Sequence, residues 1–107
     1  ELSFFFNEPE YAKEMLLWKK DPDMEKTKKH LQEVVKLVSL LSENKFNQDK
    51  IKETVWNYAE KEGRGNVLWP MRVALTGMEK SPDPFAVAGV LGKEKTIKRL
   101  IYAIEKI

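Results

Sequence analysis

Arginine and aromatic side chains gather around one proline in the sequence, and a short proline-rich loop follows them. Arg64, Trp69 and Arg72 surround Pro70, and Ser81-Pro82-Asp83-Pro84 comes soon after. Arginine hydrogen-bonds phosphates and base edges and stacks on unpaired bases, and two prolines restrict φ enough to hold a loop in one shape. Both features suit a surface that recognises single-stranded RNA. A structural alternative stays open from the residues alone, in which the arginine pairs with a carboxylate and the loop is a rigid connector.

No set of residues in the sequence has the composition of a catalytic or metal site. The chain has no cysteine and a single histidine, His30, so neither a thiolate nor a zinc site of the usual ligands can form. His30 lies among charged residues, and we expect it to be an exposed, solvated side chain. Gly63-Arg64-Gly65 lacks the Gly-Lys-Ser/Thr ending of a phosphate-binding loop and is better explained as a helix end and a turn. We therefore expect no catalytic residue, no metal and no cofactor in this chain.

Length and composition favour one folded domain. A chain of 107 residues that is 42% hydrophobic and 34% charged, with a net charge of +2, can bury a single core. No apolar run reaches the roughly 18 residues of a membrane span, so we expect a soluble chain without a targeting segment. We also expect it to be cytoplasmic and a monomer. Residues 63–107 carry 8 basic and 4 acidic side chains, against 11 and 13 in residues 1–62. A basic half can be a footprint for phosphate, although interleaved lysine and glutamate also serve solubility.

Apolar residues recur every three or four positions along most of the chain, which is the period of amphipathic helices. Nowhere do apolar and polar residues alternate between hairpin turns, so a sheet has little support. The sequence therefore predicts an all-α fold, a compact bundle of about five or six helices. The expected helices cover residues 9–19, 24–41, 48–62, 65–77 and 83–91, with a last one after Gly92.

Capping residues mark several helix ends. Asp21 and Pro22 are expected to start the helix at 24–41, and Asn47 to cap the next one. Pro70 is tolerable only near the first turn of its helix, because proline lacks a backbone N–H. The glycines expected at helix ends are Gly63, Gly77 and Gly92.

The apolar stripes of these helices predict the core. In the last helix the stripe includes Ile97 and Ile107, and Lys95, Lys98, Arg99 and Lys106 are expected largely on other faces. The residues expected in the core are Leu31, Val35, Val38, Val55, Val73, Leu75, Leu91, Leu100, Ile101 and Ile104.

Three ordered motifs resemble one known family. The segment Leu68-Trp69-Pro70-Met71-Arg72-Val73-Ala74-Leu75-Thr76-Gly77 is followed at family spacing by Ser81-Pro82-Asp83-Pro84-Phe85 and by Leu91-Gly92-Lys93-Glu94. Together they resemble bacterial-type glutamyl-tRNA synthetases. Phe4-Phe5-Phe6 and Pro9-Glu10-Tyr11 also resemble the family, so the likeness covers nearly the whole chain.

The resemblance implies that residues 1–107 form a single anticodon-binding domain, a C-terminal fragment of a longer synthetase. The apolar start after Glu1, with Leu2, favours the same interpretation. By family position, Arg72, Ser81, Pro82 and Pro84 approach the anticodon loop of glutamate tRNA. Arg64 joins them as a basic residue beside the same segment.

The catalytic signatures of the family are absent from this sequence. The resemblance therefore places the ligase reaction, with its ATP and magnesium, in a separate catalytic domain of the same synthetase. The expected partners are that domain and glutamate tRNA.

A second function stays open from the sequence. The chain could be a helical module that docks a protein partner through exposed aromatic residues such as Trp18, Trp56 or Trp69. Salt dependence separates the two functions, because phosphate binding weakens steeply with salt and apolar docking does not.

Overall fold

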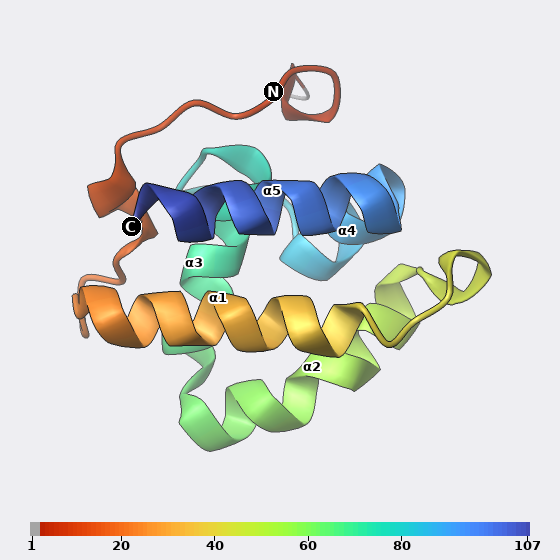
Figure 1. The fold of residues 1–107 in the computed structure, drawn as a ribbon, viewed down its shortest axis with the longest axis horizontal. Coiled ribbons are helices and arrows are strands. Elements are labelled where there is room, and N and C mark those ends of the chain that lie inside the picture. Colours follow the sequence, from red (N-terminus) through yellow and green to blue (C-terminus); the bar gives the residue numbers. More distant parts are fainter. Residues whose placement is uncertain (1–2) are drawn as a thin grey trace.

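Five α-helices and three short 3-10 helices form the chain in a computed structural model that describes residues 3–107 (Figure 1). No strand forms within this range, so the predicted all-α fold is confirmed. Glu1 and Leu2 lie outside the described residues. The α-helices are α1 (Met24–Val38), α2 (Gln48–Glu62), α3 (Arg64–Thr76), α4 (Pro84–Leu91) and α5 (Lys93–Lys106). The 3-10 helices are η1 (Ser3–Phe5), η2 (Lys13–Leu16) and η3 (Glu43–Lys45).

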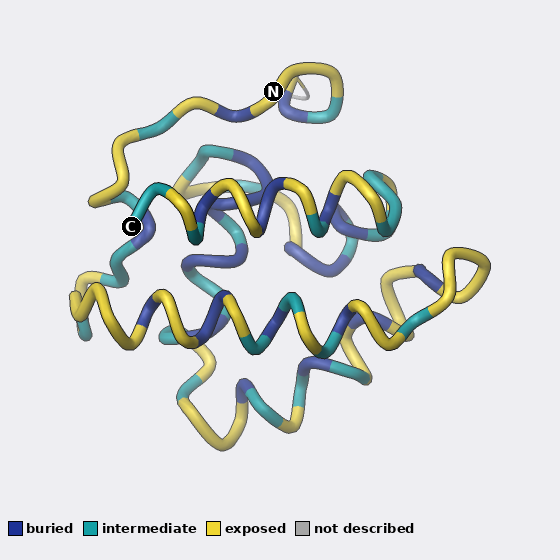
Figure 2. The backbone as a smooth tube through the Cα atoms, viewed as in Figure 1, coloured by how far each residue is buried: buried dark blue, intermediate teal, exposed yellow. Residues whose placement is uncertain are grey.

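The central helix is α3, which packs against α1, α2, α4, α5 and η2. Two long helices, α1 and α5, pack against each other and lie across the front of the molecule, with α3 behind them (Figure 1). Buried and exposed positions alternate along α1 and α5 with the helical period, so each helix turns one face inward (Figure 2). None of the helices in residues 3–107 is long and apolar enough to cross a membrane.

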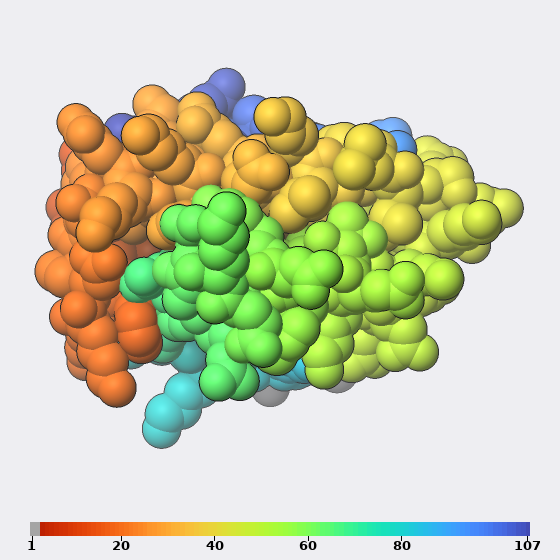
Figure 3. Space-filling model, turned by 90° about the horizontal axis from the view of Figure 1, so that it is seen from below, coloured from red at the N-terminus to blue at the C-terminus, as the bar shows by residue number. Residues whose placement is uncertain are grey.

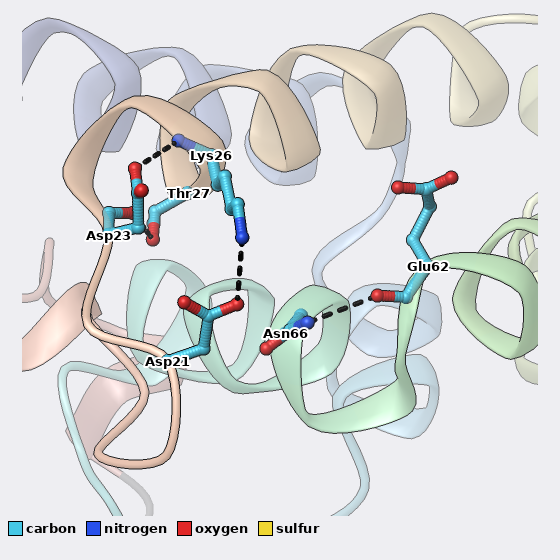
Figure 4. A network of polar contacts seen from close by, with 6 residues as sticks. All are labelled: Asp21, Asp23, Lys26, Thr27, Glu62 and Asn66. Atoms are coloured by element: carbon cyan, nitrogen blue, oxygen red, sulfur yellow. Dashed lines mark hydrogen bonds and ion pairs between the residues drawn. The ribbon is translucent and has the colours of Figure 1, made fainter.

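Asp23 caps α1, and the predicted cap at Asp21 and Pro22 is wrong by two residues. The Asp23 carboxylate accepts a hydrogen bond from the Lys26 backbone N–H at 2.9 Å, and Thr27 Oγ1 donates to the Asp23 carbonyl at 2.7 Å (Figure 4). Asp21 instead pairs with the Lys26 ammonium at 3.5 Å. Either aspartate has the chemistry of a cap, and the contacts of the folded chain select between them.

The predicted N-cap and both predicted ends of α2 are confirmed. The Asn47 side chain accepts a hydrogen bond from the Lys50 backbone N–H at 3.0 Å, and Gly63 separates α2 from α3. Asn66 Nδ2 then reaches back across this corner and donates to the Glu62 carbonyl at 3.1 Å (Figure 4). One hydrogen bond therefore ties the end of α2 to the first turn of α3.

Pro70 lies in the interior of α3, and the prediction that it stands near a first turn is wrong. The helix already begins at Arg64, so Pro70 removes one interior hydrogen bond. The proline is buried, as are Val67, Met71 and Val73 on the same helix. Burial of these apolar side chains outweighs the local penalty, because tertiary packing overrides helix propensity.

Two other predicted helices are shorter than expected. The segment 9–19 holds only η2, because its ends at Ala12 and Leu17 are extended and no side chain caps it. Helix α1 ends at Val38 rather than at Leu41. The next residue, Ser39, donates a hydrogen bond from its hydroxyl to the Val35 carbonyl at 2.6 Å.

Most of the predicted core is confirmed. The fully buried members are Leu31, Val38, Val55, Val73, Leu75 and Leu100, and the partly buried ones are Val35, Leu91 and Ile104. The prediction that Ile101 belongs to the core is wrong, since 41% of its surface is exposed. Helix α5 turns Thr96, Arg99, Leu100 and Ala103 inward instead, so its buried face is rotated from the stripe of isoleucines.

His30 is buried, which corrects the expectation of an exposed side chain. It is 7% exposed, and its Nδ1 lies 2.7 Å from the hydroxyl of Tyr58 on α2. Burial lowers the pKa of His30, more than the nearby Glu62 and Asp21 carboxylates raise it. His30 therefore joins α1 to α2 as a core residue.

Candidate nucleic-acid interface

Arg72 holds the loop that follows α3. Its Nη1 donates to the Ser81 carbonyl at 2.7 Å, to Ser81 Oγ at 3.1 Å and to the Pro82 carbonyl at 3.2 Å. Within residues 3–107 no carboxylate pairs with Arg72, whose partners are instead the Ser81 and Pro82 carbonyls and the Ser81 hydroxyl. Nε and Nη2 make no hydrogen bond to a described residue and are not buried. Two of the three guanidinium nitrogens of Arg72 therefore have no hydrogen-bond partner among the described residues.

Both ends of the loop from Gly77 to Asp83 are fixed. Gly77 adopts the left-handed conformation, with φ +70°, and its N–H donates to the Val73 carbonyl at 2.7 Å, which ends α3. At the other end the Asp83 carboxylate accepts from the Phe85 N–H at 2.7 Å and caps α4. With Arg72 bonded to its middle, the loop is held at three points. Figure 3 shows part of this region, in cyan, projecting from the surface below the orange N-terminal segment.

The structure places Pro84 differently from the other predicted loop residues. Pro82 is exposed and Ser81 is half-buried, whereas Pro84 is buried as the first residue of α4. The Pro84 ring is therefore turned into the protein and offers little apolar surface to a base. Its contribution is to start α4 and so to fix the end of the loop.

A hollow of about 210 Å³ adjoins Arg72. Leu68 contributes to its wall, and the other side chains that line it are Trp18, Arg64, Trp69 and Arg72, beside the Gly65 backbone. The predicted cluster of Arg64, Trp69 and Arg72 is thus one continuous surface. The hollow combines cationic and aromatic groups, as do sites that bind unpaired nucleotides.

Trp18 is the member of this surface that the sequence pattern did not assign to RNA. It comes from the N-terminal segment, and its ring lies so close to Gly65 that a Cβ there would overlap it. Trp69 is fixed from the same segment, because its Nε1 donates to the Met15 carbonyl at 2.9 Å. The glycine at position 65 was the available signal, since glycine inside a helix often marks a close approach.

Arg64 lies at the rim of the hollow. Its side chain is 64% exposed, and its Nε lies 3.4 Å from Glu60 Oε2, one turn earlier in sequence. The guanidinium also stands 5.8 Å from the centre of the Trp56 ring. An ion pair this exposed is weak, so Arg64 can turn toward an anion at little cost.

All three tryptophans are partly buried, so none of them is the fully exposed aromatic residue that a protein-docking module was expected to offer. Trp56 packs edge to face on Phe85, with ring centres 6.4 Å apart, and both Trp56 and Trp69 pack on the core. Among the described residues no group of three or more histidine, aspartate or glutamate side chains could hold a metal ion. The hollow beside Arg72 combines two arginine and two tryptophan side chains, the groups that contact phosphates and unpaired bases.

The family model described as the anticodon binding domain matches residues 1–104. The chain belongs to this family. Its relatives include glutamate–tRNA ligases of Clostridium botulinum and Clostridium acetobutylicum, 36% identical over 111 residues and 35% over 112 residues. Both alignments cover 100% of this chain but only 22% and 23% of the relatives, so the chain spans about a fifth of their length.

A solved structure agrees with the sequence relatives. The crystal structure of a glutamate tRNA ligase from Elizabethkingia meningosepticum, in complex with its amino acid, superposes with a TM-score of 0.78 at 33% identity. The match covers 96% of this chain and 20% of that one. The anticodon-binding domain described here therefore has the fold of the matching part of a glutamate–tRNA ligase, and the predicted family is confirmed.

Proposed function

We propose that this anticodon-binding domain binds the anticodon loop of glutamate tRNA through one surface. The surface consists of Arg72, the exposed turn at Ser81 and Pro82, and the hollow bounded by Arg64, Trp18 and Trp69. The observation that carries the proposal is that Arg72 both bonds the loop and lines the hollow. One nitrogen fixes the loop, and the other two remain available at the edge of a cationic, aromatic hollow.

The chemistry of these groups suits unpaired nucleotides. Anticodon bases are single-stranded and can be splayed out, so their hydrogen-bonding edges are accessible to side chains. The planar fork of Arg72 can donate two parallel bonds to a base edge, which point-charge lysine cannot. Arg64, exposed and loosely paired, is placed to contact phosphate. Arg72 would therefore supply discrimination, and Arg64 affinity.

We further propose that the domain acts as part of a longer glutamate–tRNA ligase. The names of the relatives support this proposal. The adenylate-forming reaction, with ATP and magnesium, then belongs to a catalytic domain of the same protein, in the cytoplasm. On this proposal the 107-residue chain is a monomer and forms no aminoacyl-adenylate. Glutamate-dependent pyrophosphate exchange by this chain alone would contradict that assignment.

Binding of RNA stem–loops tests the proposal. The wild-type chain should prefer a stem–loop with the glutamate anticodon over one with an altered anticodon, and its affinity should fall steeply with salt. Arg64→Ala should weaken both RNAs about equally and reduce the salt slope by about one. Lys95→Ala is the matched control, because Lys95 is an exposed residue of α5 that does not line the hollow and its loss removes an equal charge. Salt-insensitive binding, or equal binding of both stem–loops, would contradict the proposal.

A further inference from the structure

Arg99 on α5 is buried with no anion beside it in the described structure. It is 3% exposed, its Nη1 donates to the Leu75 carbonyl at 2.7 Å, and its Nη2 donates to the Asn7 carbonyl at 3.3 Å. Its Nε is buried without a partner. Burial lowers the pKa of the guanidinium, which the more distant Glu8 opposes. An apolar residue would fill this space without the cost of desolvation, so the arginine contributes its two directed hydrogen bonds.

Those two bonds join the last turn of α3 to residues 7–11, a segment that we call the strap. The strap lies close to Gly77, where a Cβ would meet Pro9 Cβ at 3.0 Å. A hollow of about 300 Å³ lies between the strap and Met78, the first loop residue after Gly77. The strap is also fastened to α5, since Tyr102 donates to the Glu10 carboxylate at 2.9 Å. In Figure 1 the red and orange N-terminal chain runs above α5.

The turn held by Arg99 is also the turn from which the loop departs. Next to Leu75, the Thr76 hydroxyl donates to the Arg72 carbonyl at 2.8 Å and accepts from the Met78 N–H at 3.1 Å. Arg72 in turn bonds the middle of the loop. Hydrogen bonds therefore link the strap, through Arg99, to Leu75, and its chain neighbour Thr76 is hydrogen-bonded to Arg72 and to the first loop residue.

We propose that Arg99 is a positioning residue for RNA recognition, which fixes the last turn of α3 against the strap and so holds Arg72 and the loop in their binding arrangement. The inference rests on the proposed function. Arg99 itself is too buried to touch RNA, so it acts through Arg72 and the loop. Without it, the loop should lose its single arrangement while the rest of the fold persists.

The test compares Arg99→Met, Arg99→Lys and the control Val38→Ala. Val38 is fully buried near the end of α1, so its truncation lowers stability through the core alone. The first readout is the ratio of affinities for stem–loops with the glutamate and the altered anticodon, at a temperature where every variant is folded. The second is the backbone amide chemical shifts of Met78 and Ser81 in the free protein.

Arg99→Met should lower the affinity ratio about tenfold, the size of one lost base contact, and should shift both amides. Arg99→Lys keeps a donor but not the fork, so its ratio should lie between those of the wild type and Arg99→Met. Val38→Ala should leave the ratio and both amides unchanged.

Two results would overturn the inference, and they differ from failure of the proposed function. If the wild type discriminates between anticodons and Arg99→Met changes the ratio no more than Val38→Ala does, Arg99 is structural only. If the amides of Met78 and Ser81 do not move in Arg99→Met, the loop does not depend on Arg99, whatever the RNA result. A wild type that does not discriminate at all instead contradicts the proposed function, and the inferred role in recognition with it.

Discussion

Replacing Gly65 by alanine tests how the candidate surface is built. Gly65 lies in the first turn of α3, and a Cβ at this position would overlap the ring of Trp18. Two opposing effects set the size of the change. Alanine in a helix is better than glycine by up to about 1 kcal/mol, whereas forcing atoms into a packed contact costs about 1–3 kcal/mol. The free energy of unfolding should therefore fall by about 0–3 kcal/mol in Gly65→Ala.

The effect of Gly65→Ala on the free energy of unfolding should change sign when the Trp18 ring is removed. In a Trp18→Ala background only the helix-propensity effect remains, so Gly65→Ala should raise the free energy of unfolding by up to about 1 kcal/mol. The assay is urea denaturation of the wild type, the two single variants and the double variant, with tryptophan fluorescence to follow displacement of the Trp18 ring in Gly65→Ala. Equal effects of Gly65→Ala in both backgrounds would show that Trp18 does not pack on Gly65, and the hollow would lose one wall.

Three further predictions concern the fold. Leu100→Ala should cost ~2–5 kcal/mol because this side chain is fully buried, whereas Ile101→Ala should cost clearly less because 41% of Ile101 is exposed; equal losses in urea denaturation would contradict the assigned face of α5. Burial lowers the pKa of His30, so the unfolded state takes up the proton at higher pH than the folded state, and the free energy of unfolding should fall as the pH drops below about 6.5. His30→Gln should flatten this dependence of stability on pH, and an unchanged dependence would show that another group titrates. Asp23→Ala should cost ~0.5–2 kcal/mol as the loss of an N-cap, and Asp21→Ala, which loses only a partly exposed ion pair, should cost less; the reverse order of melting temperatures would restore the cap to Asp21.

The sequence predicts most of the helices because their periodicity and caps agree. Helices α2 and α4 begin and end where Asn47, Gly63, Pro84 and Gly92 predict, since each of these residues acts on its own backbone. Local signals of this kind need no knowledge of the rest of the fold.

The errors arise where a distant partner decides the outcome. Arg99 can be buried because the Leu75 and Asn7 carbonyls accept its hydrogen bonds. His30 can be buried because the Tyr58 hydroxyl is its hydrogen-bond partner. No local pattern contains those partners, and a charged or polar side chain is exposed by default. Pro70 is a similar case, in which packing of α3 overrides a local penalty.

The candidate site was predictable only where its residues lie near one another in the sequence. Arg64, Trp69, Arg72 and the loop are near one another in sequence, and the structure brings them together as expected. Trp18 reaches the same surface from a distant segment, so only its close approach to Gly65 could have indicated it. Pro84 is close in sequence but turned inward, because its position as the first residue of α4 buries the ring.

The most direct test of recognition by Arg72 is a thermodynamic cycle between this residue and the anticodon. Four affinities are needed, those of the wild type and Arg72→Ala for stem–loops with the glutamate anticodon and with one altered base, at one salt concentration. Amide spectra of Arg72→Ala must first show an intact helical core. If Arg72 reads a base, the wild type should prefer the glutamate anticodon by roughly 1–3 kcal/mol and Arg72→Ala should lose most of that preference. An equal loss of affinity for both RNAs, or no loss for either, would contradict the assignment of Arg72 as the residue that discriminates.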